Sequence, residues 1–353
     1  MKRLSFGLMV ITFTVYGIMA AEHGFYLFSP KAPQLWHEAL ELWSNSDYVR
    51  GEGSVYLDQT ALYVKNRGAL IFHTFFGGSA LLLGLLQLWP KLQLRKKLHR
   101  NLGILYLSAA TISMVGASRF LLAIDTSEAY SGITFYWGLA GLCITTWEVL
   151  FFLTWTVVTK NFHLHRQYAL LSYAFLATAP ILRLGWMLGS PFGSQDIVNI
   201  SISMFLVPLC LFPCNLLVPD SHMHVPEESS TRRKLKFLLP TLAFIVLFFL
   251  ASLPQWWAGT SPVVTMSYAI PFSISFVTAL TLCLKYLKNN VLSKKWLVFT
   301  MSLGFSPLLA LAFYWGLTGT YDHTNNLAIS LMMSYAVSIY LGHKYFIHFH
   351  LQT

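Results

Sequence analysis

Two triplets of leucine, histidine and arginine are the residues of this sequence whose types and spacing could carry chemistry. They are Leu98-His99-Arg100 and Leu164-His165-Arg166. In each triplet a basic loop meets the start of a long apolar run, so an imidazole and a guanidinium stand at a helix entrance. Paired histidines on facing helices ligate haem iron, and arginines bind phosphate or carboxylate groups. The triplets therefore predict either a haem site or an anchor for anions such as lipid phosphates.

A second group of polar side chains lies inside the apolar runs. His73, Arg119 and Arg183 all fall near one end of their runs, and ionisable groups there are costly and usually face the interior or water. If the helices are neighbours, these three groups form a ligand-binding cluster for an anionic group. Gln87 joins the candidates, because it follows His73 by nearly four helical turns and shares its face. For the two arginines the alternative is that their long stems reach the interface.

Glu148 is a carboxylate within an apolar run, nearer the opposite end. Such a group is either protonated or paired with a cation. Its candidate partners are His99, Arg100, His165 and Arg166, with which it makes up a predicted cytoplasmic-face motif. A structural ion pair and a proton relay both remain open.

The composition defines the elements that position these residues. Hydrophobic residues make up 55% of the chain and charged residues 11%, against about 25% charged residues in a soluble domain. The mean hydropathy is +0.56. The sequence is therefore predicted to be an integral membrane protein, and its fold class an all-α polytopic bundle. Its net charge of +10 comes from short loops between apolar runs, which argues against a nucleic-acid partner.

Apolar runs long enough to cross a bilayer alternate with short polar breaks. Together with an N-terminal helix they give about ten predicted spans. The spans after the first lie near 69–90, 102–123, 132–158, 168–188, 196–217, 236–254, 263–286, 296–316 and 326–343.

The charges of the breaks alternate along the chain. Lysine and arginine gather in the breaks at 91–100, 160–166, 232–236 and 285–295, whereas the breaks at 124–131, 189–195, 255–262 and 317–325 have none. Because basic loops stay in the cytoplasm, both termini are predicted to be cytoplasmic. The predicted location is the bacterial inner membrane.

The chain is thereby divided into four predicted segments. Residues 1–21 form an N-terminal transmembrane helix, for which a signal peptide is the alternative because a basic start precedes an apolar core. Residues 22–67 form an extracytoplasmic segment, in which Leu35, Leu40 and Leu42 indicate a short amphipathic helix on the membrane. Residues 68–190 form a four-helix core with both triplets, and residues 191–353 form the C-terminal transmembrane helices.

The two triplets also indicate an internal repeat. Each begins a helix that is predicted to run from inside to outside, so the segments 69–123 and 132–188 have the pattern of one helical hairpin in tandem. Arg119 and Arg183 follow His99 and His165 at similar intervals, near the outer ends of their helices. A common ancestry of the two hairpins would give both the same polar positions.

The order of these motifs resembles a known family. The residues that carry the resemblance are His73, Gly77-Gly78, Leu85-Leu86-Gln87, Arg95, Leu98-His99-Arg100, Gly103, Tyr106, His165-Arg166, Ser172-Tyr173 and Leu182-Arg183-Leu184. Over about residues 65–190 the sequence resembles the bacterial predicted-membrane-protein family catalogued as domain of unknown function 2306. Gln167-Tyr168 departs from the bulky apolar or Trp-Met pair that the family usually shows there. The resemblance implies a fold and candidate residues, and no reaction.

Two functions follow from these observations. In the first, the protein binds or moves a small anionic solute through His73, Arg119, Arg183 and Gln87 in the outer half of the bundle. In the second, it is a b-type haem-binding electron carrier in which His99 and His165 ligate the metal. An enzymatic function is neither supported nor excluded, and the oligomeric state is open. The cysteines form no metal-binding spacing.

Overall fold

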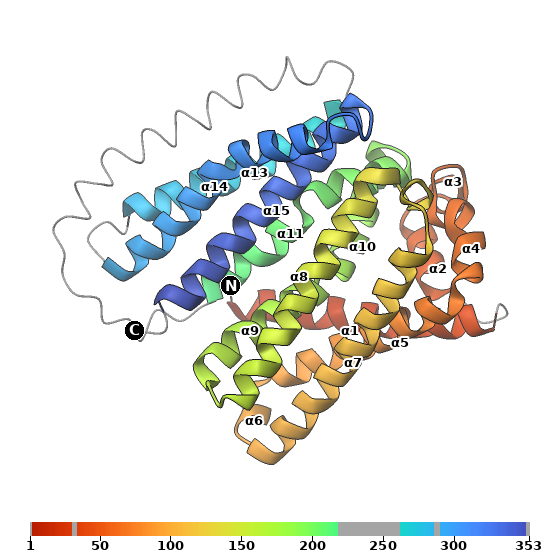
Figure 1. Ribbon diagram of the computed structural model, residues 1–353. Coiled ribbons are helices and arrows are strands. Elements are labelled where there is room, and N and C mark those ends of the chain that lie inside the picture. Colours follow the sequence, from red (N-terminus) through yellow and green to blue (C-terminus); the bar gives the residue numbers. More distant parts are fainter. Residues whose placement is uncertain (1, 30–33, 218–261, 286–289, 351–353) are drawn as a thin grey trace. The chain divides into compact units, whose positions relative to one another are not determined.

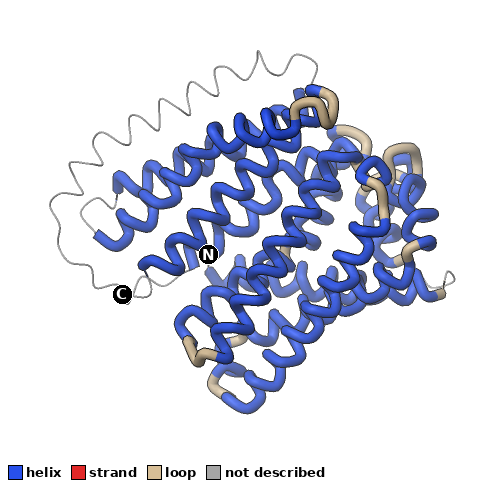
Figure 2. Tube along the Cα trace, in the orientation of Figure 1, coloured by secondary structure: helices blue, strands red, loops and turns tan. Residues whose placement is uncertain are grey.

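The computed structural model is built from helices (Figure 2). It describes residues 2–29, 34–217, 262–285 and 290–350. The chain forms two compact units, Met1–Ile200 and Ser201–Thr353. Both triplets and the predicted ligand-binding residues lie in the first unit.

Six helices form the body of the first unit. They are α1 (Lys2–Phe28), α5 (Arg67–Leu88), α7 (Lys96–Ala123), α8 (Gly132–Val158), α9 (Phe162–Leu176) and α10 (Thr178–Gly189) (Figure 1). The helices α5, α7, α8 and α9 pack in a ring, each against the next, and α1 lies against α5. The helices α7 and α9, which carry the triplets, are therefore diagonal to each other.

Small residues let these helices approach closely. A Cβ atom on Gly116 of α7 would lie 2.5 Å from the Ala69 carbonyl oxygen of α5. A Cβ atom on Gly78 of α5 would lie 2.5 Å from the Gly17 carbonyl oxygen of α1. Backbone contact of this kind drives association in membranes, where lipid leaves little hydrophobic gain between helices.

The predicted span 168–188 is divided between α9 and α10, with the break at Ala177. Pro180 follows in the first turn of α10, where a proline that lacks its N–H costs the helix no hydrogen bond. The proline cannot donate to the carbonyl four residues earlier, so the continuous helix ends there. Two helix segments thus meet in one membrane span.

A cap of short helices lies at one end of the first unit (Figure 1). It consists of α2 (Leu35–Trp43), α3 (Ser46–Arg50) and α4 (Val55–Lys65). Asn45 and Ser54 cap α3 and α4 by accepting backbone N–H groups. The predicted amphipathic helix is α2, in which Leu40 is buried and Leu42 is exposed. Shorter helices complete the connections: α6 (Pro90–Gln93), η1 (Thr126–Glu128) and η2 (Ser190–Phe192).

The second unit contains α13 (Pro262–Lys285), α14 (Asn290–Leu317) and α15 (His323–His350), which pack against one another. The helix α11 (Gln195–Leu217) begins in the first unit and ends in the second. A row of buried serines, Ser330, Ser334 and Ser338, recurs at every fourth residue of α15. Small polar side chains at this spacing allow close helix packing.

Within the described residues helices largely occupy the predicted spans, with two differences: α9 and α10 divide the span 168–188 at Ala177, and α1 continues to Phe28, past its predicted end at residue 21. Among the described residues, six helical segments are long and apolar enough to cross a membrane: 67–88, 96–123, 132–158, 164–192, 268–285 and 296–317. The predicted all-α membrane architecture is confirmed. The count of ten spans and the cytoplasmic termini stay predictions, and the predicted span 236–254 lies outside the described residues.

Candidate functional site

Arg183 of α10 occupies an aromatic cluster beneath the cap. Its guanidinium carbon lies 3.8 Å from the ring centroid of Trp186 and 6.0 Å from that of Trp36. A cation is attracted to the negative face of an indole ring, most strongly where water is excluded. Within the described residues Arg183 forms no ion pair and no hydrogen bond, so its N–H donors are free.

The positive charge of Arg183 acts on four more polar side chains. They come from four helices: His23 of α1, His37 of α2, Tyr63 of α4 and His73 of α5. Together with Trp36 and Trp186 they form what we call the Arg183 cluster. It lies at the end of the unit that is predicted to face outside.

Several buried polar atoms around the cluster lack hydrogen-bond partners within the described part of the chain. They are Trp36 Nε1, His37 Nδ1, Glu22 Oε1 and Gln34 Oε1. Buried polar groups in proteins are normally satisfied, by protein, water or ligand. The indole N–H is a donor, and the imidazole nitrogen is a donor or an acceptor according to its tautomer. The cluster thus offers a further molecule the donor of Trp36 and the ring nitrogen of His37, with the acceptor oxygens of Glu22 and Gln34 beside them.

His37 is neutral at physiological pH. Burial lowers the pKa of its imidazole to about 3, and the positive charges of His23, Arg183 and Arg50 act in the same direction against the weaker effect of Glu41. The side chain is 7% exposed. Arg183 is therefore the cation of the cluster, and His37 is a neutral hydrogen-bonding group beside it.

The cap is fastened to α10 where the cluster lies. The Tyr48 hydroxyl donates to the Trp186 carbonyl oxygen at 2.9 Å, and Trp43 Nε1 donates to that of Met187 at 2.7 Å. The indole N–H of Trp186 in turn donates to Asn199 Oδ1 at 3.1 Å. These bonds fix the ring on which Arg183 stacks.

His73 is held against α7. Its Nδ1 lies 3.2 Å from Ser113 Oγ, which donates to the His73 carbonyl oxygen at 2.8 Å. The structure brings His73 into electrostatic range of Arg183. It places Arg119 elsewhere, exposed on α7, and no charge effect of Arg119 reaches the described histidines of the cluster.

Gln87 lies at the other end of α5. Its Nε2 donates to the His99 carbonyl oxygen at 2.9 Å, so Gln87 and His73 both face α7, as their spacing predicts. The distance along the helix separates Gln87 from the Arg183 cluster by about 20 Å, at 1.5 Å per residue. Gln87 belongs with the first triplet instead.

The two triplets meet at that end of the ring. The charge of His99 acts on His165, and Tyr106 and Ser172, each seven residues further along, join their hydroxyl groups at 2.9 Å. Arg100 and Arg166 are exposed, whereas Glu148 is partly buried on α8. In the predicted cytoplasmic-face motif the two histidines are thus within electrostatic range of each other, and the two arginines are exposed.

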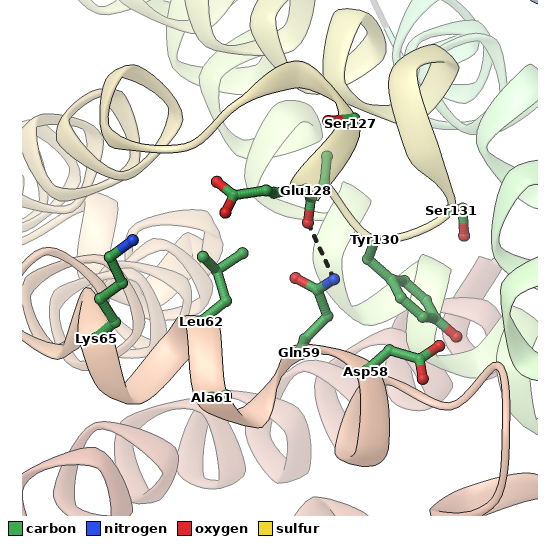
Figure 3. A pocket seen from close by; sticks show the side chains of 10 residues that line it. Asp58, Gln59, Ala61, Leu62, Lys65, Ser127, Glu128, Tyr130 and Ser131 are labelled. Atoms are coloured by element: carbon green, nitrogen blue, oxygen red, sulfur yellow. Dashed lines mark hydrogen bonds between the residues drawn. The ribbon is translucent and has the colours of Figure 1, made fainter.

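A separate open pocket of about 520 Å³ lies between α4 and η1 (Figure 3). Lys65, Asp58 and Glu128 are among its lining residues. Gln59 spans it by donating to the Glu128 carbonyl oxygen at 3.1 Å. Tyr130 also lines it and contacts Trp186 with its ring centroids 6.0 Å apart. Charges of both signs line this pocket.

The sequence pattern did not identify Trp36, His37 and His23 as partners of Arg183. Trp36 and His37 lie in a polar segment whose aromatic residues are typical of a membrane interface. The available signal was the density of tryptophan and histidine before the first core helix, but nothing in their spacing relates them to α10.

The comparisons with known proteins agree with the family resemblance. Residues 70–219 match the family model described as Predicted membrane protein (DUF2306), so the predicted resemblance is confirmed and reaches beyond residue 190. No curated protein and no solved structure matches the chain. The match and the apolar helices together identify a multi-pass membrane protein in contact with the lipid bilayer.

Proposed function

We propose that this multi-pass membrane protein binds or moves a small anionic solute at the Arg183 cluster, in the outer half of a bundle in the bacterial inner membrane. The observation that carries the proposal is the unpaired guanidinium of Arg183, stacked on Trp186 at 3.8 Å. An ionisable side chain within a membrane protein faces its interior or a water-filled path and marks ligand or ion sites.

The neighbours of Arg183 support an anion rather than a cation. The described residues place histidines and aromatic rings around it, and His37 is uncharged. A carboxylate or phosphate would accept hydrogen bonds from the guanidinium fork, which matches the geometry of such groups. It would also give Trp36 Nε1 an acceptor, where this atom is now buried without one. His73 extends the cluster toward the ring of core helices.

Thermal unfolding of the detergent-purified protein tests the proposal. Inorganic phosphate, acetate and succinate are titrated at constant ionic strength with chloride as the reference anion. A ligand that binds only the folded state stabilises it, by about 2.7 kcal/mol at one hundred times its Kd. We expect at least one of the three anions to raise the melting temperature in a saturable way. Flux of that anion into proteoliposomes then separates movement from binding.

Arg119 supplies the matched control. Arg183→Gln removes the free cation of the cluster and is expected to abolish the stabilisation, whereas Arg119→Gln changes an exposed side chain and is expected to keep it. Loss of the effect in both variants would indicate a general charge effect. Absence of stabilisation in the unmodified protein by all three anions would count against the proposal.

A further inference from the structure

The histidines of the two triplets lie at the same level of the ring of four helices. The helices α7 and α9 are diagonal in this ring, yet Tyr106 and Ser172 bridge them at 2.9 Å. His99 and His165 each precede these residues by two helical turns, about 10 Å, and share their faces. The charge effect of His99 on His165 places the two rings in range of each other.

Each ring presents a nitrogen that is buried and has no hydrogen-bond partner among the described residues. These atoms are His99 Nδ1 and His165 Nδ1. An imidazole nitrogen left in this state loses its hydration without compensation. Two such nitrogens, on helices that face each other, are a pair of candidate metal ligands.

The contacts around the two rings match those of ligating histidines. The His165 ring donates a hydrogen bond to the Leu153 backbone, and because its Nδ1 has no partner, the donor is Nε2. Its Nδ1 then carries the lone pair. Metal-ligating histidines characteristically donate their other N–H to a carbonyl or carboxylate, which fixes the tautomer and the ring orientation. On α7, the backbone carbonyl oxygen of His99 accepts a hydrogen bond from Gln87 Nε2 of α5 at 2.9 Å.

These contacts repeat between the two hairpins. Gln87 and His99 are twelve residues apart in the first hairpin, and Leu153 and His165 are twelve residues apart in the second. Leu153 follows Gln87 by 66 residues, and His165 follows His99 by the same number. In the first hairpin the glutamine side chain donates to the backbone of the histidine. In the second hairpin the His165 ring donates to the backbone of Leu153, which stands where Gln87 stands in the first. Both hairpins therefore anchor a histidine at the same place in the ring.

We propose that His99 and His165 ligate a transition metal through their Nδ1 atoms, at the end of the bundle opposite the Arg183 cluster. Imidazole suits iron, copper, zinc and nickel. No group of three or more histidine, cysteine, aspartate or glutamate side chains gathers in the described ranges, so this chain supplies two ligands. The remaining positions come from a porphyrin, whose iron takes two axial ligands, or from water on a bare ion.

One binding experiment distinguishes a haem from a bare metal ion. Separate samples of the full chain in detergent are incubated with haemin, Cu²⁺, Zn²⁺ or Ni²⁺ and then desalted. Haem is measured by the pyridine haemochrome assay and the Soret absorbance, and the ions by mass spectrometry. We expect stoichiometric retention of haemin or of one ion. If the unmodified protein retains none of the four, the proposal is wrong.

Substitutions locate the site. His99→Ala and His165→Ala are each expected to weaken retention by at least about tenfold. His99→Gln and His165→Gln keep a polar side chain of similar length and guard against loss through misfolding, with the size-exclusion profile as the check. His165→Met is expected to keep haem with a shifted spectrum, because thioethers also ligate haem iron.

His323→Ala is the control, since this histidine is exposed on α15 and bonds Tyr314 at 2.6 Å. It is expected to retain the metal fully. Equal retention in the two glutamine variants and the unmodified protein, or equal loss in the control, would overturn the assignment. Neither outcome depends on anion binding at Arg183, so this experiment tests the metal site independently of the proposed anion site.

Discussion

Arg183 and Arg119 are the same residue type at similar heights in their helices, and their surroundings make them different. Arg183 lies beneath the cap, where Trp36 comes from α2 and Trp186 from its own helix. Arg119 is exposed on α7, where its long stem can reach the interface. The role of a membrane arginine thus depends on which element covers it, and here the covering element is the short helix α2.

The buried His37 makes stability depend on pH. Its pKa is lowered from 6.5 to about 3, chiefly by burial and then by the charges of His23, Arg183 and Arg50. The unfolded chain takes up this proton near pH 6.5 and the folded protein does not, so the stability from His37 is present above pH 6.5 and is lost as the pH falls toward 3. At about pH 5 the loss is on the order of 2 kcal/mol.

His37→Gln, which cannot be protonated, is expected to flatten the fall in melting temperature between about pH 6.5 and 4. Thermal unfolding across this range, in the unmodified protein and in the variant, measures the effect. His323→Gln, at an exposed histidine, is the control and should keep the unmodified pH profile. Identical slopes in the unmodified protein and the His37 variant would show that His37 does not contribute.

At the scale of the elements, glycine contacts set the distances between helices. Gly116 brings α7 against α5, so that the backbone of α7 lies beside the Ala69 carbonyl and the His73 amide. The same approach positions Ser113, one turn earlier, to bond His73. The close approach at Gly116 therefore sets both the contact between α5 and α7 and the orientation of His73.

Gly116→Ala is expected to lower stability by about 1–3 kcal/mol, the usual cost of overpacking. The added Cβ would lie 2.5 Å from the Ala69 carbonyl oxygen and 2.6 Å from the His73 amide nitrogen, and neither backbone atom can move without displacing its helix. Melting temperature in detergent measures the cost.

Gly68→Ala is the matched control on α5. Its Cβ would meet no atom within 4 Å, and alanine has the higher helix propensity. This variant is expected to be neutral or slightly more stable. Equal destabilisation by the two substitutions would show that close packing at Gly116 is not the cause.

At the scale of the whole molecule, the charges of the connections predict the orientation in the membrane. The α7–α8 connection, which contains η1, and the α8–α9 connection lie at opposite ends of α8. The first lacks basic residues and the second has them, so the first is predicted to lie outside. This orientation puts the Arg183 cluster outside and the histidine pair inside.

Single cysteines report this orientation. In a variant without its native cysteines, Ser127→Cys on η1 is expected to react with a membrane-impermeant maleimide in intact cells, and Asn161→Cys is expected to react only after the cells are permeabilised. Both positions are solvent-accessible in the structure, since Ser127 lines the open pocket and Asn161 is exposed. The reverse pattern would invert the topology and place the Arg183 cluster inside.

The sequence by itself determined which residues form the helices and the position of each polar residue along its helix. The predicted span 132–158 coincides with α8, because twenty or more apolar residues in lipid have no alternative to internal hydrogen bonding. The offset between the triplets likewise placed His99 and His165 at one level. These properties depend on composition along the chain.

Only the tertiary structure decided which residues at one level meet. It turned Arg183 toward the ring of Trp36 and left Arg119 exposed, and it joined Gln87 to His99 instead of to His73. Lipid tails and the interior of a helix bundle are both apolar, so hydropathy carries little information about which face of a helix turns toward which neighbour. That choice comes from side-chain shape at the contacts, such as Gly116 against Ala69.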